Sequence, residues 1–203
     1  MLQKQSVSSE LLELLNNLMN DNAFQDFVLV GGTSLSLQIG HRISVDIDLF
    51  GYSEIDENFF LSVLKKYGEV ILLKKTRNIL ICSINGIKVD FVNYNYKWID
   101  ELIVEDSIRL ASKKDIGAMK LNAIAGRGSK KDFIDLFYLL KEFSINELLQ
   151  YYLLKYNDGS EFMVRKSLTY FEDADLEETP VLLHDITWEE IKTQILKQLS
   201  DLS

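Results

Sequence analysis

Two aspartates inside an apolar stretch, Asp46 and Asp48 in the run VDIDLF (residues 45–50), are the residues of this chain best suited to chemistry. The alternation of polar and apolar residues predicts a β-strand, in which side chains two positions apart project from the same face. Two carboxylates placed side by side repel each other and are costly to desolvate unless a cation lies between them. Their hard oxygen atoms favour Mg²⁺, which completes its coordination shell with water and substrate phosphates.

A third carboxylate, Asp90, is predicted to lie on a neighbouring strand. Residues 78–94, NILICSINGIKVDFVNY, contain two apolar runs joined by Asn85-Gly86, a strong signal for a hairpin turn. A two-residue turn places Ile81 opposite Asp90, whose chain neighbours are apolar like those of the first two acids. Three carboxylates on adjacent strands predict a site for two Mg²⁺ ions, or Mn²⁺ in their place, that straddle a transferred phosphoryl group.

A glycine pair precedes the strand predicted at residues 45–50. The sequence GGTS, residues 31–34, follows the apolar run FVLV and marks a passage from strand to helix. The missing side chains of Gly31 and Gly32 allow backbone N–H groups to approach a phosphate at a helix N-terminus. Thr33 and Ser34 add hydroxyl donors there, so we expect all four residues to bind the phosphates of a nucleotide.

Positive charge is concentrated between Arg109 and Lys131, where seven basic residues stand against one acid, although the formal net charge of the chain is −9. This asymmetry predicts that the segment faces a triphosphate or an RNA backbone. Arg127 lies between two glycines, where both a nucleotide-binding role and a surface role remain open. Arg42 is suited either to a phosphate or to a pair with Asp46, and His41 is expected to be a surface loop residue.

The elements that must position these residues are predicted from periodicity and capping signals. An α/β half of roughly a hundred residues precedes a half that is helical after residue 95, with domains expected at residues 1–110 and 111–203. Helices are expected at 9–20, 31–40, 56–67, 112–125 and 130–143, and after the capping pairs Ser144/Glu147 and Thr187/Glu190. Strands are expected at 27–30, 45–50, 69–75 and in the hairpin, and residues 172–178 are expected to be a loop or solvated edge.

The bulk composition limits the class of protein. The chain has 203 residues, of which 47% are hydrophobic, enough for a sizeable core. Its single cysteine, Cys82, excludes an internal disulfide and is expected to be a buried structural thiol. The absence of a signal-peptide pattern and of an apolar run of membrane-spanning length predicts a soluble, cytoplasmic protein without a membrane partner.

The pattern GGTS…DID…VDF is similar to the signature of the DNA polymerase β-like nucleotidyltransferase superfamily. Within it, HRISVDIDLF and KLNAIAGRGSKKDFIDL resemble the AbiEii/AbiGii-type toxin nucleotidyltransferase family, over roughly residues 25–140. The resemblance implies an α+β fold, in which a minimal nucleotidyltransferase core, a mixed β-sheet flanked by helices, is followed by a helical C-terminal half. In many members of the superfamily the second residue of the glycine turn is serine, whereas this chain has Gly32 followed by Thr33.

The same resemblance implies an activity and further site residues. It implies Mg²⁺-dependent transfer of a nucleoside monophosphate from an NTP to an RNA acceptor such as a tRNA 3′ end, by a toxin that a cognate antitoxin opposes. It also implies that Lys120 binds the triphosphate and that Asp132 is an acid needed for activity, whereas Asp135 is expected to form a structural pair with Arg127 or Lys131. The acidic tail after Lys141 is a candidate docking face for a basic partner.

Other functions remain open from the sequence. A small molecule or a protein hydroxyl is an alternative acceptor, and a catalytically silent binding module of the same fold is an alternative of another class. The presence of all three acids argues against the silent module. Stabilisation of the fold by Mg²⁺ and NTP is expected only for a working site.

Overall fold

A computed structural model describes residues 1–200 of the chain and consists of two compact units. The first, here called the sheet unit, comprises Met1–Gly40, Ser44–Tyr96 and Leu102–Ala111. The second, here called the helical unit, comprises His41–Ile43, Lys97–Glu101 and the chain from Ser112 onward. Each unit is described by itself.

The sheet unit is built around a seven-stranded mixed sheet with the strand order β3-β4-β5-β2-β1-β7-β6. At its centre β2 pairs in parallel with β5 and antiparallel with β1. The strands are β1 (Phe27–Leu29), β2 (Asp46–Gly51), β3 (Val70–Lys75), β4 (Ile79–Ile84), β5 (Ile87–Asn93), β6 (Ile103–Glu105) and β7 (Ile108–Leu110).

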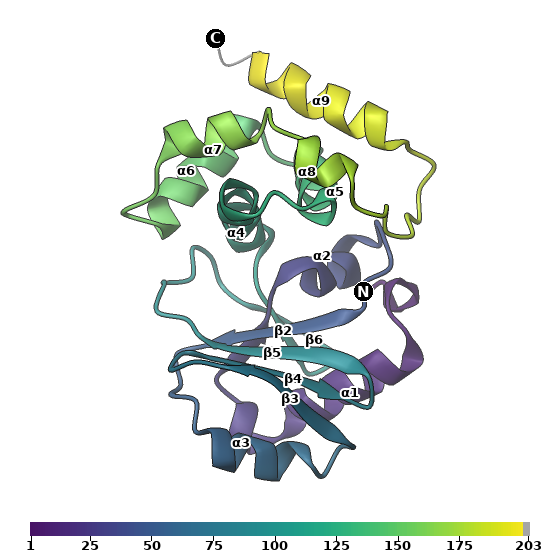
Figure 1. The fold of residues 1–203 in the computed structure, drawn as a ribbon, viewed down its shortest axis with the longest axis vertical. Helices are drawn as coiled ribbons and strands as arrows, with labels where there is room; N and C mark the ends of the chain where they lie inside the picture. Colours follow the sequence, from purple (N-terminus) through teal and green to yellow (C-terminus); the bar gives the residue numbers. More distant parts are fainter. Residues whose placement is uncertain (201–203) are drawn as a thin grey trace. The chain divides into compact units, whose positions relative to one another are not determined.

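One face of this sheet carries the hydrophobic core. The inward residues of β2, β4 and β5 pack with buried side chains of α1 (Ser9–Asn20) and α3 (Glu57–Leu64). Phe60 of α3 lies edge-on to Phe91 of β5, with ring centroids 5.3 Å apart. Helix α2 (Gly31–Ile39) and α3 lie on opposite sides of the sheet (Figure 1). The alternation of the strands therefore leaves one face for the core and one for polar residues.

The central hairpin has the register predicted from the sequence. Ile84 pairs with Ile87 and Ile81 pairs with Asp90. Asn85 and Gly86 both have positive φ angles, 50° and 86°, as the two central residues of a type I′ turn require. Because these signals are local, the sequence was sufficient to place Asp90.

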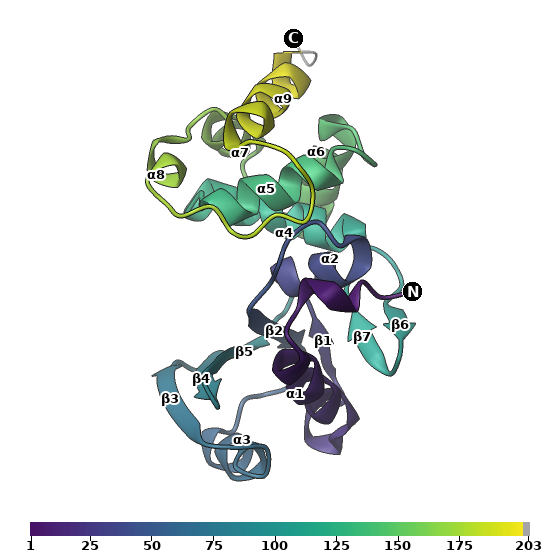
Figure 2. The ribbon, with the colours of Figure 1, turned by 90° about the vertical axis from the view of Figure 1, so that its right-hand side faces the viewer.

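The second hairpin, β6 with β7, contradicts the prediction that the chain is helical after residue 95. The two strands lie side by side at the sheet edge (Figure 2). Asp106 and Ser107 form their turn with φ angles of 51° and 64°. Strands of three residues are too short to show a period, and this turn has no glycine, so the usual hairpin signals are missing.

Six helices form the described part of the helical unit. Helix α4 packs against α5, α6 and α7, and α9 packs on α5 (Figures 1 and 2). Ser144 forms the predicted capping box with Glu147, and Thr187 and Glu190 bond each other at the start of the last helix. The helices are α4 (Lys113–Gly126), α5 (Lys130–Leu139), α6 (Ile145–Lys155), α7 (Glu161–Ser167), α8 (Glu172–Asp175) and α9 (Trp188–Ser200).

Two short helices were not predicted, namely α7 and α8, the latter within the expected loop at 172–178. One or two turns of helix give too few residues for a periodic pattern to emerge. Otherwise the architecture is the predicted one, an α+β protein whose mixed sheet, flanked by helices, is followed by a helical C-terminal half. Between residues 1 and 200, no helix has both the length and the apolar character needed to cross a membrane.

Candidate active site

The three predicted carboxylates share one face of the sheet. In the parallel pair of β2 with β5, Asp48 lies opposite Asp90 and Asp46 lies opposite Lys88. The residues between them along the strands, such as Ile47 and Val89, are fully buried on the core face. Asp46, Asp48 and Asp90 therefore project from the opposite face, where they are partly exposed.

Lys88 is a member of this cluster that the sequence analysis missed. Its Nζ atom lies 2.6 Å from each carboxylate oxygen of Asp90. The signal was present, because Lys88 stands two residues before Asp90 and so points to the same face of the strand. Burial lowers the pKa of the Lys88 ammonium, but Asp90, Asp48 and Asp46 more than offset this effect and raise it.

The carboxylate oxygens of the three acids suit a hard divalent cation, but the three side chains are not grouped closely enough to enclose one. Throughout residues 1–200, no three His, Cys, Asp or Glu side chains are grouped so as to hold a metal ion. At the sheet site the Asp90 carboxylate accepts hydrogen bonds from Lys88. Mg²⁺ commonly takes only one or two carboxylates and fills its shell with water and substrate phosphates. Asp46 and Asp48 fit that requirement.

Gly31 packs against the Asp48 carboxylate. Its φ angle is +68°, and a Cβ atom at this position would lie 2.5 Å from Oδ2 of Asp48. The preceding residue, Val30, donates its N–H to the Asp48 carbonyl oxygen over 2.9 Å. Val30 is also the N-cap of α2, and its side chain accepts no hydrogen bond from the helix. The backbone N–H groups of the first turn of α2 are therefore suited to bind an anion.

The two hydroxyls predicted to contact phosphate are engaged inside the sheet unit. Thr33, 1% exposed, donates its hydroxyl to the Asp46 carbonyl and contacts the Ser44 hydroxyl at 2.8 Å. Ser34 is fully buried and accepts from the Gln38 amide at 3.2 Å. Thr33 thus ties the start of α2 to the start of β2, which the sequence did not indicate.

In the helical unit, a buried charge cluster gathers around Lys120. Its Nζ atom lies 2.9 Å from Asp132 and 2.5 Å from Asp135, and it is 5% exposed. Asp132 also accepts hydrogen bonds from Arg127 Nε at 2.9 Å and from the Ser129 hydroxyl at 2.8 Å. Burial by itself raises the pKa of the Asp132 carboxyl, but Lys120 and Arg127 lower it to about 2.

Asp135 corrects two expectations from the sequence. It pairs with Arg42 and Lys120 and not with Arg127 or Lys131, since the Arg42 guanidinium reaches it through Nε at 2.7 Å and Nη2 at 3.0 Å. The imidazole of His41, expected at the surface, is fully buried and contacts Asp135 at 2.7 Å. Burial lowers the pKa of His41, whereas the cationic neighbours hold the pKa of Asp135 well below its usual range.

The positive segment between Arg109 and Lys131 is more neutralised than its charge count indicated. Arg109 donates to three backbone carbonyls of the sheet unit. Lys113 pairs with Glu142 and Lys114 pairs with Asp100. The acids that neutralise this segment lie elsewhere in the sequence, so a local count could not include them.

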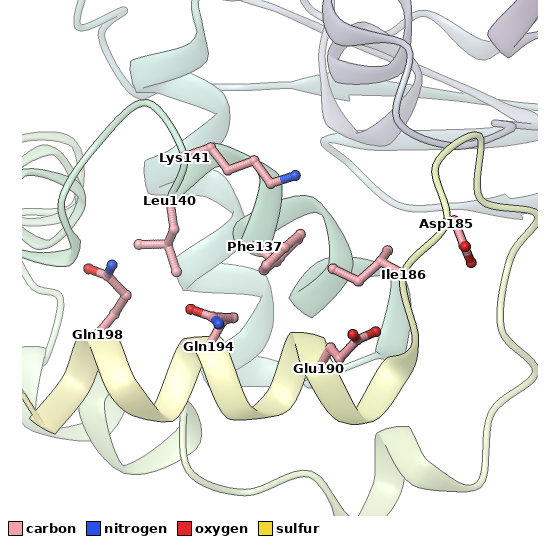
Figure 3. Close-up of a pocket in the computed structure, with 8 residues that line it drawn as sticks. All are labelled: Phe137, Leu140, Lys141, Asp185, Ile186, Glu190, Gln194 and Gln198. Carbon is pink, nitrogen blue, oxygen red and sulfur yellow. The ribbon is translucent and has the colours of Figure 1, made fainter.

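Two cavities lie away from the predicted site residues. One, of about 350 Å³, lies between α5 and α9, where Glu190, Gln194 and Gln198 extend from α9 (Figure 3). The other is a groove of about 640 Å³ in the sheet unit, lined in part by Arg77, Asn78, Asn93 and Asn95. Because it includes the residues that follow β2 and β5, the groove lies beyond the carboxyl ends of the two strands that carry the acids.

Comparison with known proteins identifies the family of the chain. Residues 13–105 match the family described as "Nucleotidyl transferase AbiEii toxin, Type IV TA system". An uncharacterized protein of Aquifex aeolicus, aq_aa25, is 36% identical over 194 residues, which is 92% of each chain. The chain belongs to the AbiEii nucleotidyl transferase toxin family. The AbiEii match spans Asp46, Asp48 and Asp90 and ends before Lys120 and Asp132, and the roles of all five residues remain predictions.

Solved structures show that the AbiEii chain has a nucleotidyltransferase-like fold. JHP933 from Helicobacter pylori superposes with a TM-score of 0.60 at 18% identity, covering 100% of this chain and 93% of that one. MenT4, a nucleotidyltransferase toxin from Mycobacterium tuberculosis, gives a TM-score of 0.58 at 16% identity, covering 96% and 83%. At these identities the likeness concerns the fold alone.

Proposed function

We propose that this AbiEii protein transfers a nucleoside monophosphate from an NTP to an acceptor hydroxyl, with Mg²⁺ as cofactor. One observation carries the proposal, the parallel pairing that sets Asp48 opposite Asp90 on the face that also holds Asp46. The packing of Gly31 against the Asp48 carboxylate supports it, because it brings the start of a helix next to the acids. A nucleotide needs both a negative cluster for its metal and N–H groups for its phosphates.

In this mechanism Asp46 and Asp48 would hold the Mg²⁺ ion that accompanies the nucleotide, and the first turn of α2 would bind the nucleotide's phosphates. Bound Mg²⁺ supplies positive charge that offsets the charge developing on the transferred phosphoryl group. The acceptor hydroxyl attacks the α-phosphorus and gives up its proton to Asp90. The bond from the α-phosphorus to the bridging oxygen breaks, and pyrophosphate leaves.

The helical unit is proposed to contribute through Lys120, for which the family resemblance predicts a contact with the triphosphate. Although burial lowers the pKa of its ammonium, Asp135 and Asp132 raise it, so Lys120 remains charged. Asp132 would then act by holding Lys120, and Arg127, whose side chain is 63% exposed, would add a second cation.

RNA is the proposed acceptor, with a tRNA 3′ end as the specific candidate. The groove beyond β2 and β5 supports this choice, because, beside the acid Glu54, it is lined by Lys75, the Arg77 guanidinium and three asparagine amides, which suit the phosphates and base edges of a single strand. Membership of a toxin family also supports a toxic activity opposed by a cognate antitoxin.

The direct test incubates the protein with Mg²⁺, total RNA and each α-labelled NTP in turn, and then identifies the labelled species. Asp48→Asn is expected to reduce labelling by on the order of 10²–10³-fold or more, as for loss of a group that stabilises transition-state charge. Its melting temperature should be unchanged or raised, because one of three clustered negative charges is removed.

Asp106→Asn is the matched control, since it changes the same functional group in the turn between β6 and β7, where Asp106 pairs with Lys4. It should label RNA as the wild type does. An Asp48→Asn protein with full activity would contradict the proposed function. Label in a small molecule or a protein, with none in RNA, would retain the transfer reaction and reject the RNA acceptor.

A further inference from the structure

The cluster on the sheet contains a cation of its own. Lys88 and Asp90 project from the same face of β5 and lie opposite Asp46 and Asp48 of β2. The Lys88 ammonium contacts both oxygens of the Asp90 carboxylate at 2.6 Å, so it binds the acid symmetrically. Four charged groups thus form one patch of three acids and one base.

The ammonium occupies the side of Asp90 through which the carboxylate would chelate a divalent ion with both oxygens. A cation with 2.6 Å contacts to both oxygens engages the lone pairs through which a carboxylate coordinates a metal. An ammonium and a metal ion placed there together would also repel each other. Lys88 and a metal therefore compete for Asp90.

Lys88 is able to withdraw. Its side chain is 40% exposed, whereas that of Asp90 is 16% exposed. A lysine side chain has four carbons and flexible torsions, so its charged end can move into water while its stem stays on the strand. Asp90 sits on a central strand between β4 and β2 and has no such freedom.

We propose that Lys88 is a positioning residue that serves as the resident counter-ion of Asp90 and releases this carboxylate when a divalent cation binds. The inference rests on the proposed function, since it concerns how the same site passes from its metal-free to its loaded form. Without metal, the ammonium offsets the repulsion among the three acids. On loading, the divalent cation takes over that task and displaces the ammonium, so that a lone pair of Asp90 no longer bonded to Lys88 can accept the proton of the acceptor hydroxyl.

The test measures Mn²⁺ binding to the full chain without nucleotide, by calorimetric titration, for the wild type and for Lys88→Met. Because Lys88→Met removes the competing cation, its Mn²⁺ affinity should be roughly three- to fivefold higher, the size expected for a partly exposed ion pair. Its melting temperature without metal should fall, and Mn²⁺ should restore it. Lys88→Arg keeps the ion pair through a bidentate guanidinium and should bind Mn²⁺ no more tightly than the wild type.

Lys75→Met is the matched control for the loss of one positive charge. Lys75 lies on β3, is 46% exposed, and pairs with Glu57 at 2.6 Å, away from the three acids in the sheet order. Its Mn²⁺ affinity should remain within twofold of the wild type. Equal gains for Lys75→Met and Lys88→Met would reduce the effect to net charge and overturn the inference.

Failure of this inference can be distinguished from failure of the proposed function. If the wild type labels RNA but Lys88→Met binds Mn²⁺ with unchanged or lower affinity, Lys88 is not a competitor and the transferase function stands. If adding Asp48→Asn to Lys88→Met leaves Mn²⁺ binding intact, the ion binds elsewhere and the inference fails. If in addition the wild type labels no acceptor, the proposed function fails too.

Discussion

Two features of the structure at position 31 require glycine. Its positive φ angle of +68° favours glycine, and the nearest neighbour of a built Cβ is the Asp48 carboxylate at 2.5 Å. The sequence predicted that missing side chains would let backbone N–H groups approach a phosphate. The structure adds that the absent Cβ leaves room for the carboxylate of Asp48.

Gly31→Ala is therefore expected to reduce nucleotidyl transfer at least tenfold, because the new methyl group must displace the Asp48 carboxylate. It should also lower the free energy of unfolding by about 1–2 kcal/mol, the usual cost of a positive φ for a residue with a Cβ. Gly86→Ala is the control, since Gly86 has a φ of +86° and nothing within 4 Å of a built Cβ. Transfer rates and denaturant titrations of both variants check this, and equal activities would contradict the role of Gly31.

The contacts that follow from strand periodicity and turn signals could be predicted from the sequence, whereas the contacts that depend on the tertiary fold could not. The alternation in 45–50 and the Asn85-Gly86 turn were enough to bring Asp46, Asp48 and Asp90 to one face. His41 and Arg42 meet Asp135 more than ninety residues away along the chain, so no local pattern could place them. Lys88 is the intermediate case, because its position followed from the strand period but its pairing did not.

At the level of elements, helices α4 and α5 are joined by buried charge. Lys120 of α4 contacts Asp132 and Asp135 of α5, and both acids are fully buried. Buried charges stay in place only while each is paired, and removing one partner commonly costs more than the pair contributes. The cluster therefore fixes the contact between these helices and ties their stability to pH.

Asp132→Asn should expose that dependence. The folded-state pKa of Asp132 is about 2 against an ordinary value of 3.8, so its contribution to stability is complete above pH 4 and is lost as the pH falls toward 2. Between pH 4 and pH 2, we expect the unfolding free energy of the wild type to fall by about 2 kcal/mol because Asp132 becomes protonated. This part of the pH dependence should be absent from Asp132→Asn. At pH 7 the variant should be less stable by on the order of 3–5 kcal/mol.

Urea titrations at several pH values between 2 and 7 measure both effects. The control is Asp158→Asn, which removes a carboxylate from an exposed position of the same unit. If Asp132→Asn were as stable as the wild type at pH 7, the cluster would not hold α4 and α5 together.

For the whole molecule, charge limits the ways in which RNA can be bound. The net charge is −9, and six of the seven basic residues between Arg109 and Lys131 bond to acids or backbone oxygens within their own unit. A general positive field is thus absent, and an RNA acceptor must rely on a few local cations. Arg77, in the groove beyond β2 and β5, is the candidate in the sheet unit.

Transfer to RNA should consequently depend on salt in a way that transfer to a small acceptor would not. With about three phosphate contacts, raising the salt from about 50 to 200 mM should weaken RNA binding roughly ten- to twentyfold, because each contact releases counterions. Arg77→Ala should weaken RNA binding at low salt. It should also reduce the slope of log affinity against log salt by the share of about one phosphate contact. The measurement is the RNA concentration at half-maximal labelling across a salt series at fixed Mg²⁺ and NTP. Since screening also removes the repulsion between RNA and a chain of charge −9, a response that is flat or rises with salt would mean that phosphate contacts do not determine the acceptor, and would favour a small molecule.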